Sequence, residues 1–450
     1  MGRTPCGLCD QCCSGGWCAS AAAGLAPLAC LADQFPRYGP GQEPGRWAGG
    51  DGLGVVARLA FAAEGLDASL KPMRVLIFTS SGGTAHDAAA YALKDWFQLC
   101  RPGDEVLVEH VLENASAVTR GGVELYNWIQ RHQPWLHQIY WRLVEFEDLI
   151  KPGRPLFGRR YVIRLLRAFR PDVLISTHPH INRGHFDLAK RVLGPHLRTI
   201  TCNTELDGGF GFSRNWISHA ADLHWALTPE VSAEVGRRHW LMFPYPSERV
   251  RCLGPLLYPE FHRASPAPVR LEGRPRLVLA SGANGANNHI PLLEQLLPFA
   301  DQLDVVVLCG RRVDVRQVLE SWAVDHPALS ISVLGFQGPE AMVELYRTAW
   351  AHVARPGART ATEALFLGCP LIFNRIGSTM PQELLALRYF KRRGLERSLR
   401  RPRDLALVVR KWLHNPDHYH ALRDRYRCNL LQADPSALID VLAASGPGVA

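Results

Sequence analysis

Short runs of apolar and β-branched residues alternate with longer amphipathic stretches from Met73 onward. This alternation is typical of β-α-β units stacked around a mainly parallel sheet. In the first half it predicts strands at 74–79, 105–109, 172–177, 198–202 and 249–253. After a link rich in proline and glycine it restarts, with strands predicted at 276–281, 303–309, 330–334, 350–354 and 370–374. The pattern therefore predicts an α/β fold with two doubly wound, Rossmann-like domains of similar size.

Chain length also favours two domains. A single hydrophobic core seldom grows beyond about 250 residues, and this chain has 450. We place an N-terminal domain at 73–262, a linker at 263–275, a C-terminal domain at 276–432 and a tail at 433–450. Residues 1–72 are rich in Gly, Ala and Pro and contain a single lysine, so we expect a disordered leader or a wrongly assigned start there.

The leader holds six of the twelve cysteines, around the stretch "CGLCDQCCSGGWC". Cys-x-x-Cys spacing suits zinc or the start of an iron-sulfur site. No second pair of ligands follows at zinc-finger spacing, so an unstructured leader is favoured over a metal site. Whether this segment binds a metal stays open, and no other stretch of the sequence has a metal motif.

Two similar turns open the two halves. "RVLIFTSSGGTAH" starts at Arg74 and "PRLVLASGANGANNH" starts at Pro275, and each runs from a predicted strand through small residues into a helix. Such a turn brings backbone N–H groups and the positive end of a helix onto an anion. Glycine in these places also serves helix packing alone. Two turns of the same plan indicate ligands on both sides of a common cleft, at the carboxyl ends of the strands.

Net charge and hydropathy limit the kinds of binding partner that the sequence suits. The net charge of +9 fits an anionic partner, and no run reaches the roughly 18 apolar residues that cross a bilayer. The segment 125–171 combines aromatic residues with arginines, which suits a helix lying in a lipid headgroup layer. A helix pair that only covers the sheet explains the same pattern, and single-stranded nucleic acid is a third partner that it fits. The candidates for membrane contact are Trp128, Trp135, Trp141, Arg159 and Arg160.

The stretch "RPGARTATEALFLGCPLIFN", residues 355–374, carries the most specific chemistry. A glycine turn follows a predicted strand, Thr360 and Thr362 open a helix, and Glu363 falls within its first turns. N–H groups and hydroxyls at a helix start suit phosphates, and a carboxylate suits the vicinal hydroxyls of ribose. Capping of the helix favours the same residue types. "GSTMPQELLALRYF" then begins another helix with Gln382 and Glu383.

This segment resembles the donor-binding signature of glycosyltransferase family 28. That family has the GT-B fold and includes the peptidoglycan lipid II glucosaminyltransferase and the monogalactosyl- and glucosyldiacylglycerol synthases. Upstream, "VLGFQGPEAMVELYRTAWAHVAR" is similar to the Gly-Phe loop, helix and short strand of the family. The resemblance implies that the UDP-sugar donor is bound by Gly282, Asn284, Gly285, Gly310, Phe336, Gly357, Thr360, Glu363, Gln382 and Glu383.

The N-terminal half resembles the glycolipid branch of the family. "GGTAH" is similar to its glycine loop ending in histidine, "PDVLISTHPHINR" to its strand followed by His-Pro, and "TCNTELDGGFGF" to its Thr-Asp-Leu segment. The resemblance covers about 73–430 and points to His86 as the catalytic base, with Glu205 or Asp207 orienting the base or the acceptor. The acceptor-side candidates are Gly82, Gly83, His178 and Pro179.

Four positions depart from the family pattern. Ala85 stands where glycine is usual and Ala283 where glycine is commoner, Glu205 stands where aspartate is usual, and Ala386 where many members have asparagine. The spacing from Asn374 to Gln382 and Glu383 is also longer than in the diacylglycerol synthases. Because Ala386 follows the Gln-Glu pair expected near the donor sugar, the identity of that sugar stays open.

The family implies an inverting transfer of a hexose from a UDP-sugar to a lipid acceptor, foremost diacylglycerol, without a cofactor or metal. It also implies a peripheral protein on the cytoplasmic side of a membrane, in contact with an anionic membrane surface and not with nucleic acid. Three alternatives stay open, namely transfer to another lipid-linked acceptor, a UDP-sugar 2-epimerase-like enzyme, and a catalytically degenerate protein that only binds a nucleotide or lipid.

Overall fold

The computed structural model describes residues 71–132, 136–150, 155, 157–238, 243–268, 270–271, 273–280 and 288–444. Three parts of the sequence predictions lie outside the described residues. They are the cysteine-rich part of the leader, Trp135, and the turn with Gly282, Asn284 and Gly285. What the sequence predicts for those segments therefore stays a prediction.

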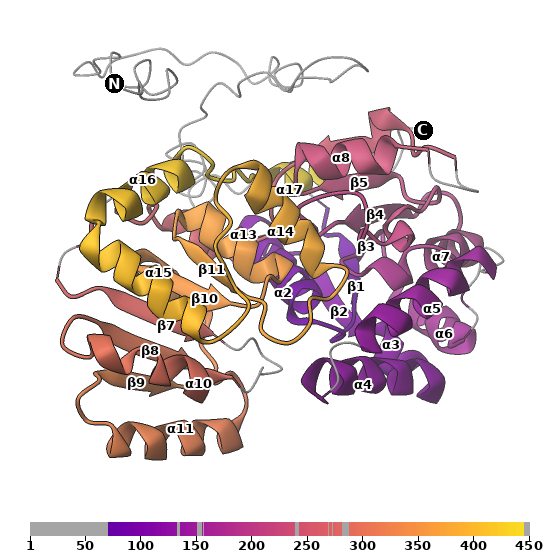
Figure 1. The fold of residues 1–450 in the computed structure, drawn as a ribbon. Helices are drawn as coiled ribbons and strands as arrows, with labels where there is room; N and C mark the ends of the chain where they lie inside the picture. Colours follow the sequence, from indigo (N-terminus) through magenta and orange to yellow (C-terminus); the bar gives the residue numbers. More distant parts are fainter. Residues whose placement is uncertain are drawn as a thin grey trace, which may run out of the picture. The chain divides into compact units, whose positions relative to one another are not determined.

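Two six-stranded sheets organise the described chain (Figure 1). The first has the strand order β2-β1-β3-β4-β5-β6 and the second the order β12-β11-β10-β7-β8-β9. Neighbouring strands in both sheets pair in parallel. In each sheet the chain starts at an internal strand, builds to one edge and then returns to build the other, which is the doubly wound order. The predicted α/β fold with two Rossmann-like sheets is confirmed.

The ten predicted strands are present to within one residue at each end. The first sheet consists of β1 (Arg74–Thr79), β2 (Glu105–His110), β3 (Val173–Ser176), β4 (Arg198–Cys202), β5 (Leu223–Ala226) and β6 (Val250–Cys252). The second consists of β7 (Arg276–Ala280), β8 (Asp304–Leu308), β9 (Ile331–Leu334), β10 (Ala351–Ala354), β11 (Leu371–Asn374) and β12 (Ser398–Leu399).

Two of these strands, β5 and β12, were not predicted. β5 reads "LHWA", so a histidine interrupts a run of only four residues, although His224 is fully buried in the sheet. β12 has two residues, too few to carry a periodic signal.

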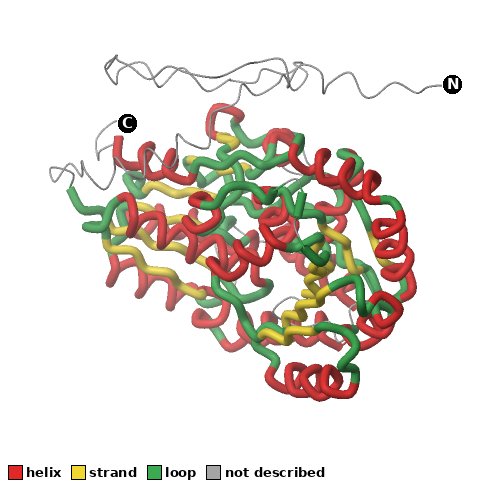
Figure 2. Tube along the Cα trace, turned by 90° about the vertical axis from the view of Figure 1, so that its left-hand side faces the viewer, coloured by secondary structure: helices red, strands yellow, loops and turns green. Residues whose placement is uncertain are grey.

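Helices lie on both sides of the strands (Figure 2). Those of the N-terminal half are α2 (Thr84–Cys100), α3 (Val111–Ala115), α4 (Ala117–His132), α5 (His137–Ile150), α6 (Arg159–Phe169), α7 (His185–Leu193), α8 (Pro229–Gly236) and α9 (Pro259–Arg263). Those of the C-terminal half are α10 (His289–Glu294), α11 (Val313–Asp325), α12 (Pro339–Thr348), α13 (Ala358–Leu367), α14 (Glu383–Arg392), α15 (Arg403–His414), α16 (Pro416–Arg427) and α17 (Pro435–Ala444).

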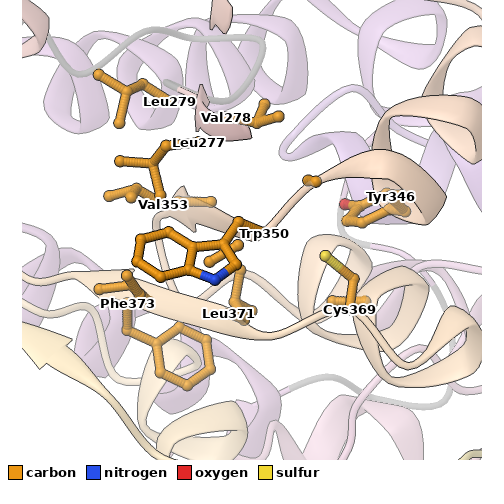
Figure 3. Packing of buried hydrophobic residues seen from close by; sticks show 14 of the residues in the cluster. Leu277, Val278, Leu279, Tyr346, Trp350, Val353, Cys369, Leu371 and Phe373 are labelled. Atoms are coloured by element: carbon orange, nitrogen blue, oxygen red, sulfur yellow. The ribbon is translucent and has the colours of Figure 1, made fainter. Parts of the chain in front are cut away.

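The central strands are buried on both faces, as a parallel sheet covered by two layers of helices requires. In the second sheet every residue of β10 and β11 is buried, and Figure 3 shows Val353, Leu371 and Phe373 packed around Trp350. Burial of one such side chain contributes about 1.5–3 kcal/mol. This core supports the strand ends from which the described loops begin.

The last helix returns to the first sheet. The segment predicted as a tail, 433–450, contributes α17, whose Leu438, Ile439 and Leu442 are buried in the same cluster as Val75 and Trp96. The returning chain passes against Gly254, where an added Cβ would overlap the carbonyl of Gln432. Glycine is therefore required there for close backbone approach as well as for a φ of 79°.

Helix α6 covers the first sheet with one face. Val162, Leu166 and Phe169 are buried in its core, whereas Arg159 and Arg160 are exposed. The interpretation of the insert as a covering element therefore holds for the apolar face of α6. Contact of its arginines with a membrane stays a prediction.

Candidate active site

Loops at the carboxyl ends of β1, β3 and β4 bring the N-terminal candidates together. These three strands are neighbours in the sheet, and parallel neighbours end at the same edge. The rings of His86 and His178 lie 4.5 Å apart, and a Cβ on Gly82 would lie 3.7 Å from Nε2 of His178. Gly83 has a φ of 107°, and Pro179 is buried as the first residue of a 3-10 helix. All the acceptor-side candidates thus lie at one edge of the sheet.

The backbone orients His86. Its Nδ1 lies 2.8 Å from the carbonyl oxygen of Thr177. Because a carbonyl only accepts, Nδ1 carries the hydrogen and Nε2 keeps its lone pair. Burial lowers the pKa of His86 to about 4, so its imidazole is neutral at physiological pH. In this state His86 can accept a proton through Nε2.

The glycine turn after β1 holds a carboxylate of the protein itself. Oε1 of Glu113 accepts from the backbone N–H of Ser81 at 2.6 Å and from the hydroxyl of Ser80 at 3.0 Å. A negative carboxylate on the N–H groups of a turn competes with a phosphate for the same donors. The turn is therefore poorly suited to bind the nucleotide phosphates.

Glu205 is buried beside Trp216, whose ring lies 5.8 Å from that of His86. Burial raises the pKa of Glu205 to about 8, so its carboxyl group is mostly protonated at neutral pH. A protonated carboxyl group can donate one hydrogen bond as well as accept. Glu205 therefore lies near the base as a neutral acid.

Asp207 pairs with the C-terminal half of the chain. Its Oδ1 lies 2.8 Å from Nη2 of Arg392, and its Oδ2 lies 3.6 Å from Nε of Arg388. Arg388 also donates to the carbonyl oxygens of Gly208 and Phe210. The structure gives Asp207 arginine partners on α14 and brings it into no described contact with His86.

The predicted ribose ligand Glu363 is fixed on α13. Tyr346 donates to its Oε2 at 3.0 Å, and Nε of Arg359 donates to its Oε1 at 2.7 Å. The side chain is buried. A carboxylate has about four lone-pair sites, so both oxygens retain capacity for a further donor. Arg359 and Tyr346 thus hold a carboxylate ready beside the start of this helix.

Arg355 and Glu383 shape the loop 375–382. Nε and Nη2 of Arg355 lie 3.0 and 2.6 Å from the two carboxylate oxygens of Glu383, a bidentate pair. Arg355 also donates to the carbonyls of Ile376 and Ser378 at 3.2 and 2.6 Å. The carboxylate predicted to meet sugar hydroxyls is therefore already engaged by this arginine.

Gln382 reaches from the start of α14 to the N-terminal half. Its Nε2 lies 3.0 Å from the hydroxyl of Tyr126 and 3.4 Å from Nε2 of His137. Gln138 adds a hydrogen bond of 2.9 Å to the carbonyl of Thr379. Helices α4 and α5 therefore contact the loop that carries the sugar-binding candidates.

The remaining donor candidates lie beyond the ends of their strands. Thr360 is partly buried in the first turn of α13, directly after Gly357. Gly310 follows β8 with a φ of 59°, and a Cβ on Gly335 would lie 3.7 Å from its carbonyl oxygen. Phe336 is half exposed, with the guanidinium of Arg311 at 4.7 Å over its ring. These residues form a second group at the edge of the second sheet.

Sequence reasoning missed several of the contacting residues, among them Glu113, Tyr126, His137, Trp216 and Arg388. Arg388 lies within the stretch "GSTMPQELLALRYF", and Tyr126 and His137 lie within 125–171, but neither pattern indicates which residues they contact. The concentration of aromatic residues in 125–171 pointed to a membrane instead.

Two related proteins indicate the class of enzyme to which this candidate active site belongs. The chain is 24% identical over 389 residues to a processive diacylglycerol beta-glucosyltransferase of Bacillus subtilis, which covers 83% of this chain and 95% of the relative. It is 26% identical over 403 residues to a probable chloroplastic monogalactosyldiacylglycerol synthase 2 of Oryza sativa subsp. indica, with 82% and 79% covered. This chain is a glycosyltransferase.

The glycosyltransferase is similar in structure to MurG of Acinetobacter baumannii, with a TM-score of 0.55 and 16% sequence identity, over 83% of this chain and 100% of MurG. This likeness confirms the GT-B fold. No protein-family model matches the chain. The resemblance to glycosyltransferase family 28 is nevertheless confirmed by the relatives and the fold. Among the helices of the described residues, none is both long and apolar enough to cross a bilayer.

Proposed function

We propose that this glycosyltransferase moves a hexose from a UDP-sugar to a lipid hydroxyl, foremost that of diacylglycerol, with inversion at the anomeric carbon. The observation that carries the proposal is the orientation of His86, whose Nδ1 donates to Thr177 at 2.8 Å and leaves Nε2 as a base. The names of the two relatives, both of which refer to diacylglycerol lipids, support the acceptor.

In the proposed step, Nε2 of His86 takes the proton of the acceptor hydroxyl while that oxygen forms a bond to C1 of the hexose. The bond between C1 and the phosphate oxygen breaks, and its electron pair leaves with UDP. Attack from the face opposite the leaving group inverts C1. Glu205, as a neutral acid, and His178 orient the acceptor. For Asp207 we propose a role in holding the two halves together, because its partners are arginines of α14.

On the donor side, Glu363 receives the ribose hydroxyls, since hydrogen bonds from Arg359 and Tyr346 hold its carboxyl group in place. Thr360 and the start of α13 face the diphosphate, with Arg311 or Arg312 as a source of positive charge, and Phe336 and Gly310 border the base. Gln382 and Glu383 contact the hexose. The proposed reaction uses no cofactor or metal, and nucleic acid is not a partner.

The membrane contact proposed for this protein involves α4 and α5. Leu125 and Trp128 on α4 and Ile139 and Leu143 on α5 expose 46–65% of their surface. Exposed large apolar side chains in such number favour a membrane or protein partner. Trp141 packs against Phe210 at 5.5 Å beside them. With the net charge of +9, these helices support peripheral binding to an anionic membrane, which we propose to be on its cytoplasmic side.

Purified protein is incubated with labelled UDP-glucose or UDP-galactose and vesicles of diacylglycerol in anionic lipid. Label in the lipid phase with at least one donor is the expected result. Conversion of one UDP-sugar into its epimer without lipid label would indicate the 2-epimerase alternative. Absence of lipid label with every UDP-sugar and every lipid-linked acceptor, while UDP still binds, would indicate a degenerate binder.

A further inference from the structure

The side chain of Gln382 is held at one end and open at the other. Tyr126 and His137 approach its Nε2 at 3.0 and 3.4 Å, whereas its Oε1 is buried and has no hydrogen-bond partner among the described residues. A buried amide oxygen without a partner is destabilising, because it has lost its hydrogen bonds to water. A hydroxyl group of a ligand would remove that destabilisation. The described contacts therefore leave Oε1 as an acceptor for a ligand.

Tyr126 also lies close to the proposed catalytic base, His86. A Cβ on Gly83 would lie 3.9 Å from the hydroxyl of Tyr126 and 4.0 Å from Cδ2 of His86. Tyr126 thus lies next to the turn that carries the proposed base. A ligand group that meets Gln382 therefore lies near the point of transfer, where the hexose and not the nucleotide is expected.

Both anchoring residues are uncharged and firmly placed. The ring of Tyr126 lies 5.0 Å from that of His137 at an angle of 73°, and the Tyr126 hydroxyl also accepts from Nε2 of Gln130 at 2.8 Å. Burial lowers the pKa of His137 to about 4, so its ring is neutral and can accept from the amide. Burial also raises the pKa of Tyr126. Both residues are suited to fix an amide, because the hydroxyl of Tyr126 and Nε2 of His137 can each accept from its nitrogen.

The two ends of a side-chain amide differ in hydrogen bonding, because its oxygen only accepts and its nitrogen only donates. With Nε2 anchored, Oε1 faces the ligand and selects a hydroxyl that donates. Without the anchors the amide can rotate by half a turn and present either group. The orientation of the Gln382 amide therefore depends on Tyr126 and His137. The same orientation decides between hexoses that differ in the configuration of one hydroxyl.

We propose that Tyr126 and His137 are positioning residues that fix the amide of Gln382 on a hydroxyl of the transferred hexose, and so set the discrimination between donor sugars. The inference rests on the proposed function and deepens it. It adds that sugar selectivity, a property of the C-terminal half, depends on residues of α4 and α5 in the N-terminal half.

The test measures kcat/KM for UDP-glucose and UDP-galactose, which differ only at one hydroxyl, with diacylglycerol vesicles as acceptor. Tyr126→Phe removes the hydroxyl and keeps the ring. We expect it to lower the ratio of the preferred to the other donor about tenfold, mainly through a higher KM for the preferred UDP-sugar. The Kd for UDP alone should not change, because the proposed contact of Gln382 is with the hexose and not with UDP.

Tyr140→Phe is the matched control. Tyr140 is on α5, its ring lies 5.9 Å from that of Tyr126, and its hydroxyl donates to the carbonyl of Gly122 at 3.2 Å. Its removal should leave the donor ratio unchanged. His137→Phe, measured in parallel, should lower the ratio in the same direction as Tyr126→Phe, and it keeps the test decisive if one variant does not fold.

The outcomes separate the inference from the function on which it rests. Turnover of no UDP-sugar by the wild-type protein would overturn the proposed function itself. An active wild-type protein whose Tyr126→Phe and His137→Phe variants keep both the donor ratio and the KM would overturn the inference alone. An equal loss in Tyr140→Phe would also overturn it, since the effect would then be one of general packing.

Discussion

The pH dependence of transfer tests the state of His86 directly. Burial lowers its pKa to about 4, and the carbonyl of Thr177 fixes its Nδ1 hydrogen. With a pKa of about 4, about 97% of His86 is neutral at pH 5.5, against about 9% for an ordinary histidine at 6.5. The two cases differ about tenfold in the amount of active base at that pH.

We therefore expect kcat/KM at pH 5.5 to stay within about twofold of its value at pH 7.5. The assay is the initial rate of UDP release with UDP-sugar well below its KM and with vesicles of constant charge. A fall of about tenfold between these pH values, with a midpoint near 6.5, would refute the reasoning. It would mean that the base is solvated or that another histidine limits the rate.

Acid unfolding must be separated from this effect. Burial also lowers the pKa of His137 and His352 to about 4, from an unfolded value near 6.5. The unfolded chain then binds more protons below pH 6.5, so the stability that these neutral rings allow is fully present above that pH and falls as the pH drops toward 4. Circular dichroism at each pH, and full recovery of the rate after return to pH 7.5, are the controls.

Three further predictions concern single side chains and the membrane face. His86→Ala should abolish transfer and change the Kd for UDP by less than about threefold in calorimetry; retained turnover would exclude His86 as the base. Asp207→Asn should lower the melting temperature and reduce kcat by less than about threefold, because its partners are arginines and not the base; a loss of several orders of magnitude in kcat at unchanged melting temperature would assign it to the chemistry. Trp128→Ala combined with Leu143→Ala should reduce flotation with anionic vesicles and leave UDP binding intact, since both side chains are exposed; unchanged flotation would place the membrane contact elsewhere.

Most of the strands, and the sheet edge at which the candidate site lies, were predictable from the amino-acid sequence alone. A parallel strand buried on both faces is a continuous apolar run, and its carboxyl end is where loops carry side chains to a ligand. That reasoning is sufficient to bring His86, His178 and Glu205 to one edge. The same reasoning failed for β5, where a buried histidine interrupts the apolar run. A hydrophobicity pattern shows only that histidine is polar, and it does not show that the surrounding packing accommodates the buried ring.

The sequence by itself determined the alternation of strands and helices, the two halves and the motif residues on their turns. Only the tertiary structure decided which of those residues meet. Gln382 and Tyr126 are 256 positions apart, and Asp207 meets Arg392 across the two halves. Spacing rules reach about one turn of a helix or one pair of strands. Contacts between distant segments follow from how two cores pack, and that packing is a property of the whole chain.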